Sequence, residues 1–135
     1  MFRLSLSPGS KSDIRSLKAR DPDAAALLLA GLQEIQGNQE LLDSLTIRDF
    51  DDVLPELNVS YDVKQWWQYW KRGRNLWRLR LMDDERLLSG YRVIYAFIPR
   101  ETHYLVLGVV PRSFNYDPNH TITKRIIGEY DDLCA

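Results

Sequence analysis

The sequence lacks several features on which common biochemical functions depend. Cysteine occurs once in the 135 residues, as Cys134, so an intrachain disulfide is impossible and a reducing compartment, the cytoplasm, is expected. No apolar run approaches the ~18 residues of a membrane span, and the N-terminus is too polar and too short for a signal peptide. A phosphate-binding glycine loop, a His/Cys cluster at zinc spacing and a Gly-x-Ser-x-Gly elbow are also missing. These absences predict a protein that works without a metal or a cofactor.

Positive and negative charges are unevenly distributed along the chain, although the formal net charge is only −1. Residues 1–63 carry 6 Lys and Arg against 11 Asp and Glu, whereas residues 64–125 carry 12 against 5. A basic segment of this kind is expected where a protein binds a polyanion such as a nucleic acid. The alternative is a basic face that contacts only solvent.

Alternation and capping signals predict one strand and a helical hairpin in the first part of the chain. Apolar residues alternate with polar ones over residues 2–6, which is typical of a short strand. Ser7-Pro8 and Asp21-Pro22 each combine a helix cap with a proline at the first helical position, so a helix should follow each pair.

The segment after the hairpin is harder to interpret. Gly37-Asn38 predicts a stop or kink, after which Leu41, Leu42 and Leu45 extend the helical hairpin. Residues 46–62 contain Pro55 among several acidic residues, and we expect an irregular acidic insertion there.

Three alternating segments, at residues 77–82, 91–98 and 103–110, predict an antiparallel meander. The last two are joined by a connection short enough for a hairpin. A C-terminal helix should begin at Pro118 to Thr121. Strands that follow helices in this order predict an α+β fold with an N-terminal strand and helical hairpin, a three-stranded antiparallel meander and a C-terminal helix.

Arginines on and beside these strands are the candidate functional residues. Arg78 and Arg80 should share one face of their strand, because side chains two residues apart point the same way. Arg92 lies on the next strand, and Arg112 follows the third, with Tyr116 four residues beyond it. The planar guanidinium group matches phosphate oxygens, so these residues suit a phosphate ligand. A solvated sheet face is the alternative.

The stretches NLWRLRL, LLSGYRVIYAF and HYLVLGVVPRSFNYD resemble the core of the RelE/ParE toxin superfamily. The matching elements are the basic strand with Arg78 and Arg80, then Gly90-Tyr91-Arg92, then Arg112 with Tyr116 before the last helix. The segment SPGSKSDIRSL resembles the first helix of that family. The resemblance implies one RelE-like domain over residues 1–135. The combination of Arg78, Arg80, Arg112 and Tyr116 resembles the RNA-cleaving RelE branch.

The resemblance also implies a function and a set of partners. RelE-like proteins are toxins of type II toxin–antitoxin systems, and they cleave mRNA on the ribosome until a cognate antitoxin binds them. The ribose 2′-hydroxyl attacks the adjacent phosphate and leaves a cyclic phosphate, without a metal. By this resemblance, Arg92 and Arg112 would stabilise the phosphate. Tyr116 would stack on a base or assist proton transfer.

The general base is an open question at the level of sequence. Relatives often carry lysines where this chain has Arg78 and Arg80, and arginine is a poor proton acceptor. Tyr116 is the first candidate, with an ordinary pKa of about 10 that neighbouring arginines would lower. His120 is the second, because histidine titrates near neutral pH.

An aromatic and basic stretch runs from Trp66 to Arg74. Aromatic residues interleaved with cations can stack on bases and hold phosphates, so Lys71, Arg72 and Arg74 are candidate RNA-binding residues. The alternative is that Trp66 and Trp70, four residues apart on a helix, pack on the core or under a partner.

Two other functions fit the same segments. A ParE-like gyrase poison would share the fold and need no catalytic residues. A non-catalytic binding module would use the sheet only to hold a partner.

Overall fold

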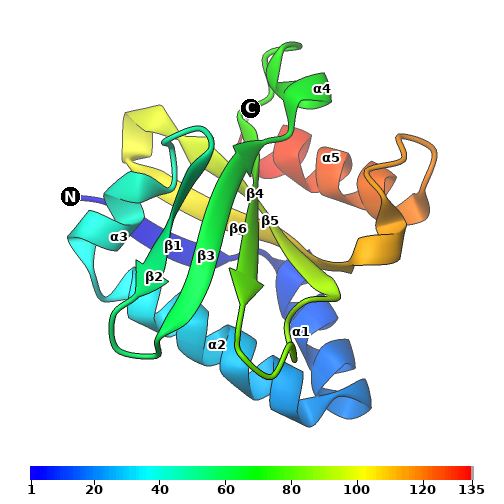
Figure 1. The fold of residues 1–135 in the computed structure, drawn as a ribbon. Coiled ribbons are helices and arrows are strands. Elements are labelled where there is room, and N and C mark those ends of the chain that lie inside the picture. Colours follow the sequence, from blue (N-terminus) through cyan, green and yellow to red (C-terminus); the bar gives the residue numbers. More distant parts are fainter. Residues whose placement is uncertain (135) are drawn as a thin grey trace.

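A six-stranded mixed sheet forms the centre of the computed structural model, which describes residues 1–134 (Figure 1). The strand order is β1-β6-β5-β4-β3-β2. Every neighbouring pair is antiparallel except β1 and β6, which are parallel. The strands are β1 (Arg3–Leu6), β2 (Phe50–Leu54), β3 (Val59–Gln65), β4 (Leu76–Met82), β5 (Tyr91–Ile98) and β6 (His103–Pro111). The predicted α+β class is confirmed.

Helices begin where the capping signals predict. The Ser7 hydroxyl accepts a hydrogen bond from the Ser10 backbone N–H, and the Asp21 carboxylate accepts one from Ala24. Each cap is followed by proline at the first helical position. The helices are α1 (Pro8–Arg20), α2 (Pro22–Gln36), α3 (Gln39–Ser44), α4 (Trp67–Trp70) and α5 (Thr121–Leu133), with short 3-10 turns η1 (Pro99–Glu101) and η2 (Arg112–Phe114). No described helix is long and apolar enough to cross a membrane.

The predicted irregular insertion at residues 46–62 is wrong, because this segment contributes a β-hairpin. Strands β2 and β3 pair over five residues on each strand. Pro55 lies in the turn between them, where Asn58 adopts a left-handed backbone and its N–H donates to Leu54. The buried side chains of Tyr61 and Val63 alternate with more exposed ones along β3. The meander therefore has five strands, from β2 to β6, rather than three.

The two faces of the sheet are covered differently. Helices α1, α2 and α3 bury one face in a core that includes Leu17, Leu28, Leu42 and Leu79. On the other face, α5 packs Ile126 and Tyr130 against residues of β5 and β6. In Figure 1, α5 lies at the upper right, and α2 runs along the bottom of the molecule. Helix α5 thus leaves the β3 and β4 side of this second face uncovered.

An ion pair between α1 and α5 anchors the last helix. The Arg125 guanidinium donates two hydrogen bonds to the Asp13 carboxylate, at 2.6 and 2.8 Å. Strand β1 pairs with β6 only as far as Val106. Beyond that point Asp13 accepts the Val109 N–H and Arg125 donates to the Leu107 carbonyl. The two side chains therefore bind backbone groups of β6 beyond the end of its pairing with β1.

We expect Asp13→Ala to destabilise the fold by removing this anchor. The free energy of unfolding, measured by urea denaturation, should fall by roughly 2 to 3 kcal/mol, less than for a fully buried pair because the Arg125 side chain keeps 33% of its exposure. Arg3→Ala is the control. It breaks the exposed pair with Glu101 and should cost less than about 1 kcal/mol. Equal losses in the two variants would contradict the anchoring role.

Candidate functional site

The uncovered part of the second face carries a cluster of arginines around Tyr116. Three arginines lower the pKa of the Tyr116 hydroxyl by their positive charge: Arg78 and Arg80 on β4, and Arg92 on β5. Asp62 on β3 acts against them. Arg112, in the η2 turn, adds to the positive charge around Arg92. We call these six residues the arginine cluster. It contains five of the residues that the sequence singled out, together with Asp62, whereas Lys71, Arg72, Arg74 and His120 are not part of it.

Asp62 holds two of the arginines in place. Its carboxylate accepts hydrogen bonds from Arg78 Nη1 and from Arg80 Nε and Nη2, the last at 2.6 Å. Arg80 lies directly opposite Asp62 in the β3–β4 register. The prediction that Arg78 and Arg80 share a face is confirmed. Their role in RNA binding stays a prediction, and the structure adds that Arg78 is buried and that both arginines share one counterion. Asp62 was not among the predicted site residues, because it lies in the segment 46–62, where an irregular insertion was expected.

Arg92 is held by backbone carbonyls instead. Its Nη1 donates to the carbonyl oxygens of Ser89 and Tyr91, at 3.0 and 2.8 Å. Burial lowers the pKa of Arg92, and the positive charges of Arg80, Arg78 and Arg112 lower it further. The neighbouring Tyr116 hydroxyl raises the pKa of Arg92. Like charges held this close repel one another, so an anion that binds between them would relieve the repulsion.

Arg112 is the exposed member of the cluster. Its backbone N–H donates to the Gly90 carbonyl at 2.7 Å, which ties the η2 turn to the start of β5. The Arg112 side chain has no hydrogen bond or ion pair to any of residues 1–134. Its guanidinium group is therefore free to bind a phosphate.

Tyr116 follows a sharp turn that aims it at the cluster. Asn115 and Tyr116 both adopt left-handed backbone conformations, which are strained for non-glycine residues and are often found at functional sites. The Tyr116 ring packs edge-on against Trp66 and Phe114, with centroid distances of 5.5 and 5.1 Å. Burial raises the pKa of Tyr116, and the opposing effects of Arg78, Arg92 and Arg80 do not overcome it. The expectation of a lowered pKa is wrong, so Tyr116 is better suited to donate a proton than to accept one.

His120 caps a helix. Its Nδ1 accepts a hydrogen bond from the Ile122 N–H at 3.1 Å at the start of α5. The ring also packs on Phe114, with centroids 5.8 Å apart. Protonation of Nδ1 would remove the cap, which argues against the predicted acid–base role.

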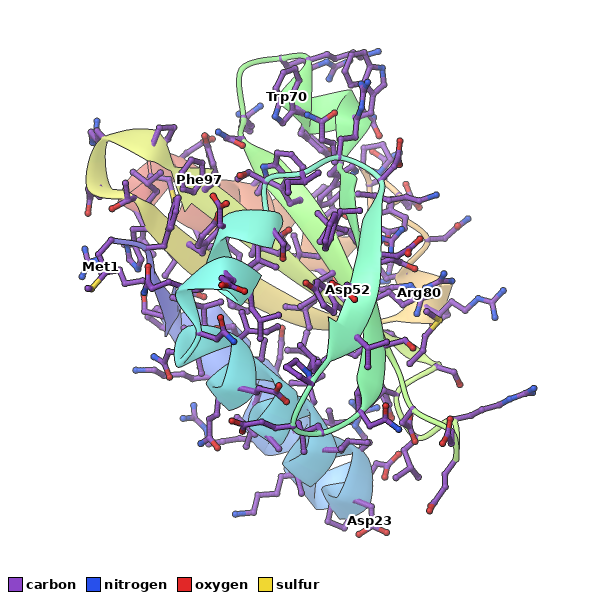
Figure 2. All side chains as sticks on the ribbon, turned by 60° about the vertical axis from the view of Figure 1, so that its left-hand side comes forward. Met1, Asp23, Asp52, Trp70, Arg80 and Phe97 are labelled. Carbon is purple, nitrogen blue, oxygen red and sulfur yellow. The ribbon has the colours of Figure 1, made fainter. Side chains whose placement is uncertain are left out.

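Of the two tryptophans that were expected to pack on the core or under a partner, only Trp66 packs on the core. Trp66 and Tyr69 are buried, whereas Trp67 and Trp70 are exposed and stack on each other. Figure 2 shows Trp70 at one end of the molecule and Asp23 at the other.

The predicted RNA-binding residues of this stretch have different environments. Arg74 forms a two-hydrogen-bond pair with Asp131 on α5, at 3.0 Å each, so it is not a free cation. Lys71 and Arg72 are exposed in the turn after α4.

Other parts of the surface are poorer candidates. The largest pocket, of about 610 Å³, lies between α2, the β2–β3 turn and the loop after β4. Its lining includes the carboxylates of Asp23, Asp83, Asp84 and Glu85, which would repel a phosphate. Among residues 1–134, no group of three or more His, Cys, Asp or Glu side chains is placed to hold a metal ion.

Comparison of the chain with protein families, curated proteins and solved structures finds no match. The case for a function therefore rests on the arginine cluster and on the sequence resemblance of its residues.

We expect the Tyr116 hydroxyl to ionise above the ordinary pKa of about 10, because burial disfavours tyrosinate. The difference in tyrosinate absorbance between the wild type and Tyr116→Phe, followed through a pH titration, gives the midpoint. Because burial favours the neutral hydroxyl in the folded state, the stability that neutral Tyr116 contributes is complete below pH 10. It is lost as the pH rises through the raised pKa.

Asp62→Asn should lower the Tyr116 midpoint, because the Asp62 charge opposes ionisation of the hydroxyl. Asp23→Asn, exposed on α2 at the other face of the sheet, is the matched control and should leave the midpoint unchanged. A Tyr116 midpoint below 10 in the wild type would contradict the buried placement.

Proposed function

We propose that the chain is the toxin of a type II toxin–antitoxin pair and an endoribonuclease that cleaves mRNA without a metal. The observation that carries the proposal is the Tyr116 hydroxyl placed among Arg78, Arg80 and Arg92, beside the unpaired guanidinium of Arg112. Phosphodiester cleavage by a 2′-hydroxyl needs stabilisation of a negatively charged phosphorane and two proton transfers. The arginine cluster holds groups suited to each of these tasks.

The role of each arginine in the proposed reaction follows from the groups that it already binds. Arg112 and Arg92 would bind the scissile phosphate and stabilise the charge that develops on its oxygens. Arg78 and Arg80 already share Asp62, so they would contribute positive potential more than direct contacts. Their rigid placement means that little reorganisation is needed when the transition state forms.

The two proton transfers fall to Asp62 and Tyr116. Arginine and a tyrosine of raised pKa keep their protons at neutral pH, which leaves the Asp62 carboxylate as the acceptor for the 2′-hydroxyl proton. Three hydrogen bonds occupy Asp62, out of the roughly four that a carboxylate accepts. As the 2′-oxygen bonds to phosphorus and the bond to the 5′-oxygen breaks, Tyr116 would protonate the leaving 5′-oxygen. The products would be a 2′,3′-cyclic phosphate and a free 5′-hydroxyl.

A cognate antitoxin is the expected protein partner. A small acidic protein whose segment covers the arginine cluster would neutralise its charge and block RNA access. The ribosome, with mRNA in place, is the expected site of action.

A non-catalytic binding module is the second candidate. The neutralisation of Arg78 and Arg80 by Asp62 favours it, because it leaves fewer cations free for catalysis. Induced expression separates the alternatives: translation arrest with mapped mRNA cuts supports the nuclease. A DNA-damage response with intact mRNA would instead support a ParE-like gyrase poison.

Arg112→Ala should reduce mRNA cleavage by about 10²- to 10³-fold, and Tyr116→Phe by about 10²- to 10⁴-fold. The reasons are the loss of a charge that stabilises the phosphorane and the loss of the proton donor. Cleavage is measured on ribosome-bound mRNA, with folding checked by circular dichroism. Arg100→Ala, in the exposed η1 turn, is the control and should stay fully active. Full activity in folded Arg112→Ala and Tyr116→Phe would refute the site assignment.

A 2′-deoxy nucleotide at the scissile position should stop cleavage, because the attacking hydroxyl is then missing. Products from unmodified RNA should end in a 2′,3′-cyclic phosphate or a 3′-phosphate. EDTA should leave the reaction intact on a preassembled substrate whose own structure survives chelation. Loss of activity under that condition would mean that a metal takes part.

A further inference from the structure

A pocket of about 320 Å³ lies directly beside the arginine cluster, where β3 ends and α4 begins. Its volume is in the range of about 300 to 1,000 Å³ that is typical of small-ligand sites. The pocket shares Arg78 and Tyr116 with the arginine cluster. The remaining lining residues are Lys64, Gln65, Trp66, Trp67 and Gln68.

Two polar atoms of the lining residues are buried and have no partner within residues 1–134. They are the Nε1–H donor of Trp66 and the Oε1 acceptor of Gln65. Trp66 is only 5% exposed, so its donor cannot be satisfied by bulk solvent. Gln65 lies opposite Trp77 in the β3–β4 register, on the face that α1, α2 and α3 cover, whereas Trp66 packs on the second face. A buried polar group without a hydrogen bond costs free energy, and a ligand that accepts from the Trp66 donor would remove that cost.

The rim of the pocket presents an aromatic surface. Trp67 is 55% exposed and Trp70 is 38% exposed, although tryptophan is usually well buried. Their rings stack with centroids 5.9 Å apart and an angle of 14° between the planes. Such a flat, exposed aromatic face is the kind of surface on which unpaired nucleobases stack.

We propose that this pocket holds one unpaired base of the RNA strand whose phosphate lies on the arginine cluster. The base would stack on Trp67 while its edge accepts a hydrogen bond from Trp66 Nε1. The inference rests on the proposed function, because the cluster places the phosphate. A base fits better than an apolar side chain of a protein partner, which would leave the Trp66 donor unpaired. Each of the four bases carries an acceptor on its Watson–Crick edge, so the pocket does not demand one base.

Nuclear magnetic resonance of the tryptophan indole N–H groups tests the pocket in the intact protein. The probe is a hexamer of 2′-O-methyl RNA, which cannot be cleaved by 2′-hydroxyl attack. Its binding should shift the Trp66 indole resonance, which is assigned by its loss in Trp66→Phe. The Trp77 indole should not move, because it donates to Asn75 Oδ1 at 2.6 Å. An abasic hexamer with the same phosphates should leave the Trp66 resonance in place.

Substitution of the exposed stacking residue gives the second measurement. Trp67→Ala should weaken hexamer binding about 10-fold or more, whereas Trp67→Phe should keep most of the affinity. Val53→Ala, which truncates an exposed apolar side chain on β2, should bind like the wild type. An unmoved Trp66 resonance, an equal shift with the abasic hexamer, or unchanged affinity in Trp67→Ala would each overturn the base pocket. Hexamer binding without any cleavage of unmodified RNA would refute the proposed nuclease and leave the pocket standing.

Discussion

The Asp13–Arg125 ion pair decides which part of the sheet remains open. It binds β6 at the point where β1 no longer pairs with it, and it thereby holds α5 over β5 and β6. Gly108 allows this close approach, since a side chain there would lie 2.9 Å from both Arg125 and Ile126. With α5 anchored on that side, the β3–β4 part of the same face has no long helix over it within residues 1–134, and only the short helix α4 contacts β4 there. The arginine cluster lies in this area.

Burial explains why the four arginines of the cluster differ in chemistry. A guanidinium group taken out of water needs a counterion or hydrogen-bond acceptors, and each arginine meets this need differently. Arg78 and Arg80 share Asp62, and Arg92 uses two carbonyls of its own loop. Arg112 stays in solvent and needs no partner. The three members with hydrogen-bond partners thus form a fixed scaffold of positive charge, and the exposed Arg112 remains available to a ligand.

Local signals in the sequence were sufficient for much of the fold. Ser7-Pro8 and Asp21-Pro22 place the helix starts because capping involves only neighbouring residues. The β5–β6 hairpin follows from alternation and a short connection. The β2–β3 hairpin was missed because Pro55 and the flanking acidic residues are typical of loops, and β2 is an edge strand whose aspartates face solvent.

The site was predicted less completely, because its chemistry depends on contacts between distant segments. Arg92, Arg112 and Tyr116 come together as the sequence indicated. Asp62 could be recognised as part of the site only when the pairing of β3 with β4 was known. The direction of the Tyr116 pKa depends on burial of its ring under Trp66, fifty positions earlier in the chain. The exposed stack of Trp67 and Trp70 depends on how the short helix α4 sits at the end of β3.

The parallel pairing of β1 with β6 has a consequence for how the chain is made. Arg3 is opposite His103, so β1 pairs with a strand that is synthesised 100 residues later. Contacts of such long sequence separation form late and slow the overall rate of folding. Until β6 emerges, the apolar side of the α1–α2 hairpin has an incomplete sheet to pack on, and neither Arg112 nor Tyr116 exists yet. A nascent chain interrupted before that stage is therefore a target for chaperones and proteases, and it carries no assembled arginine cluster into the cell.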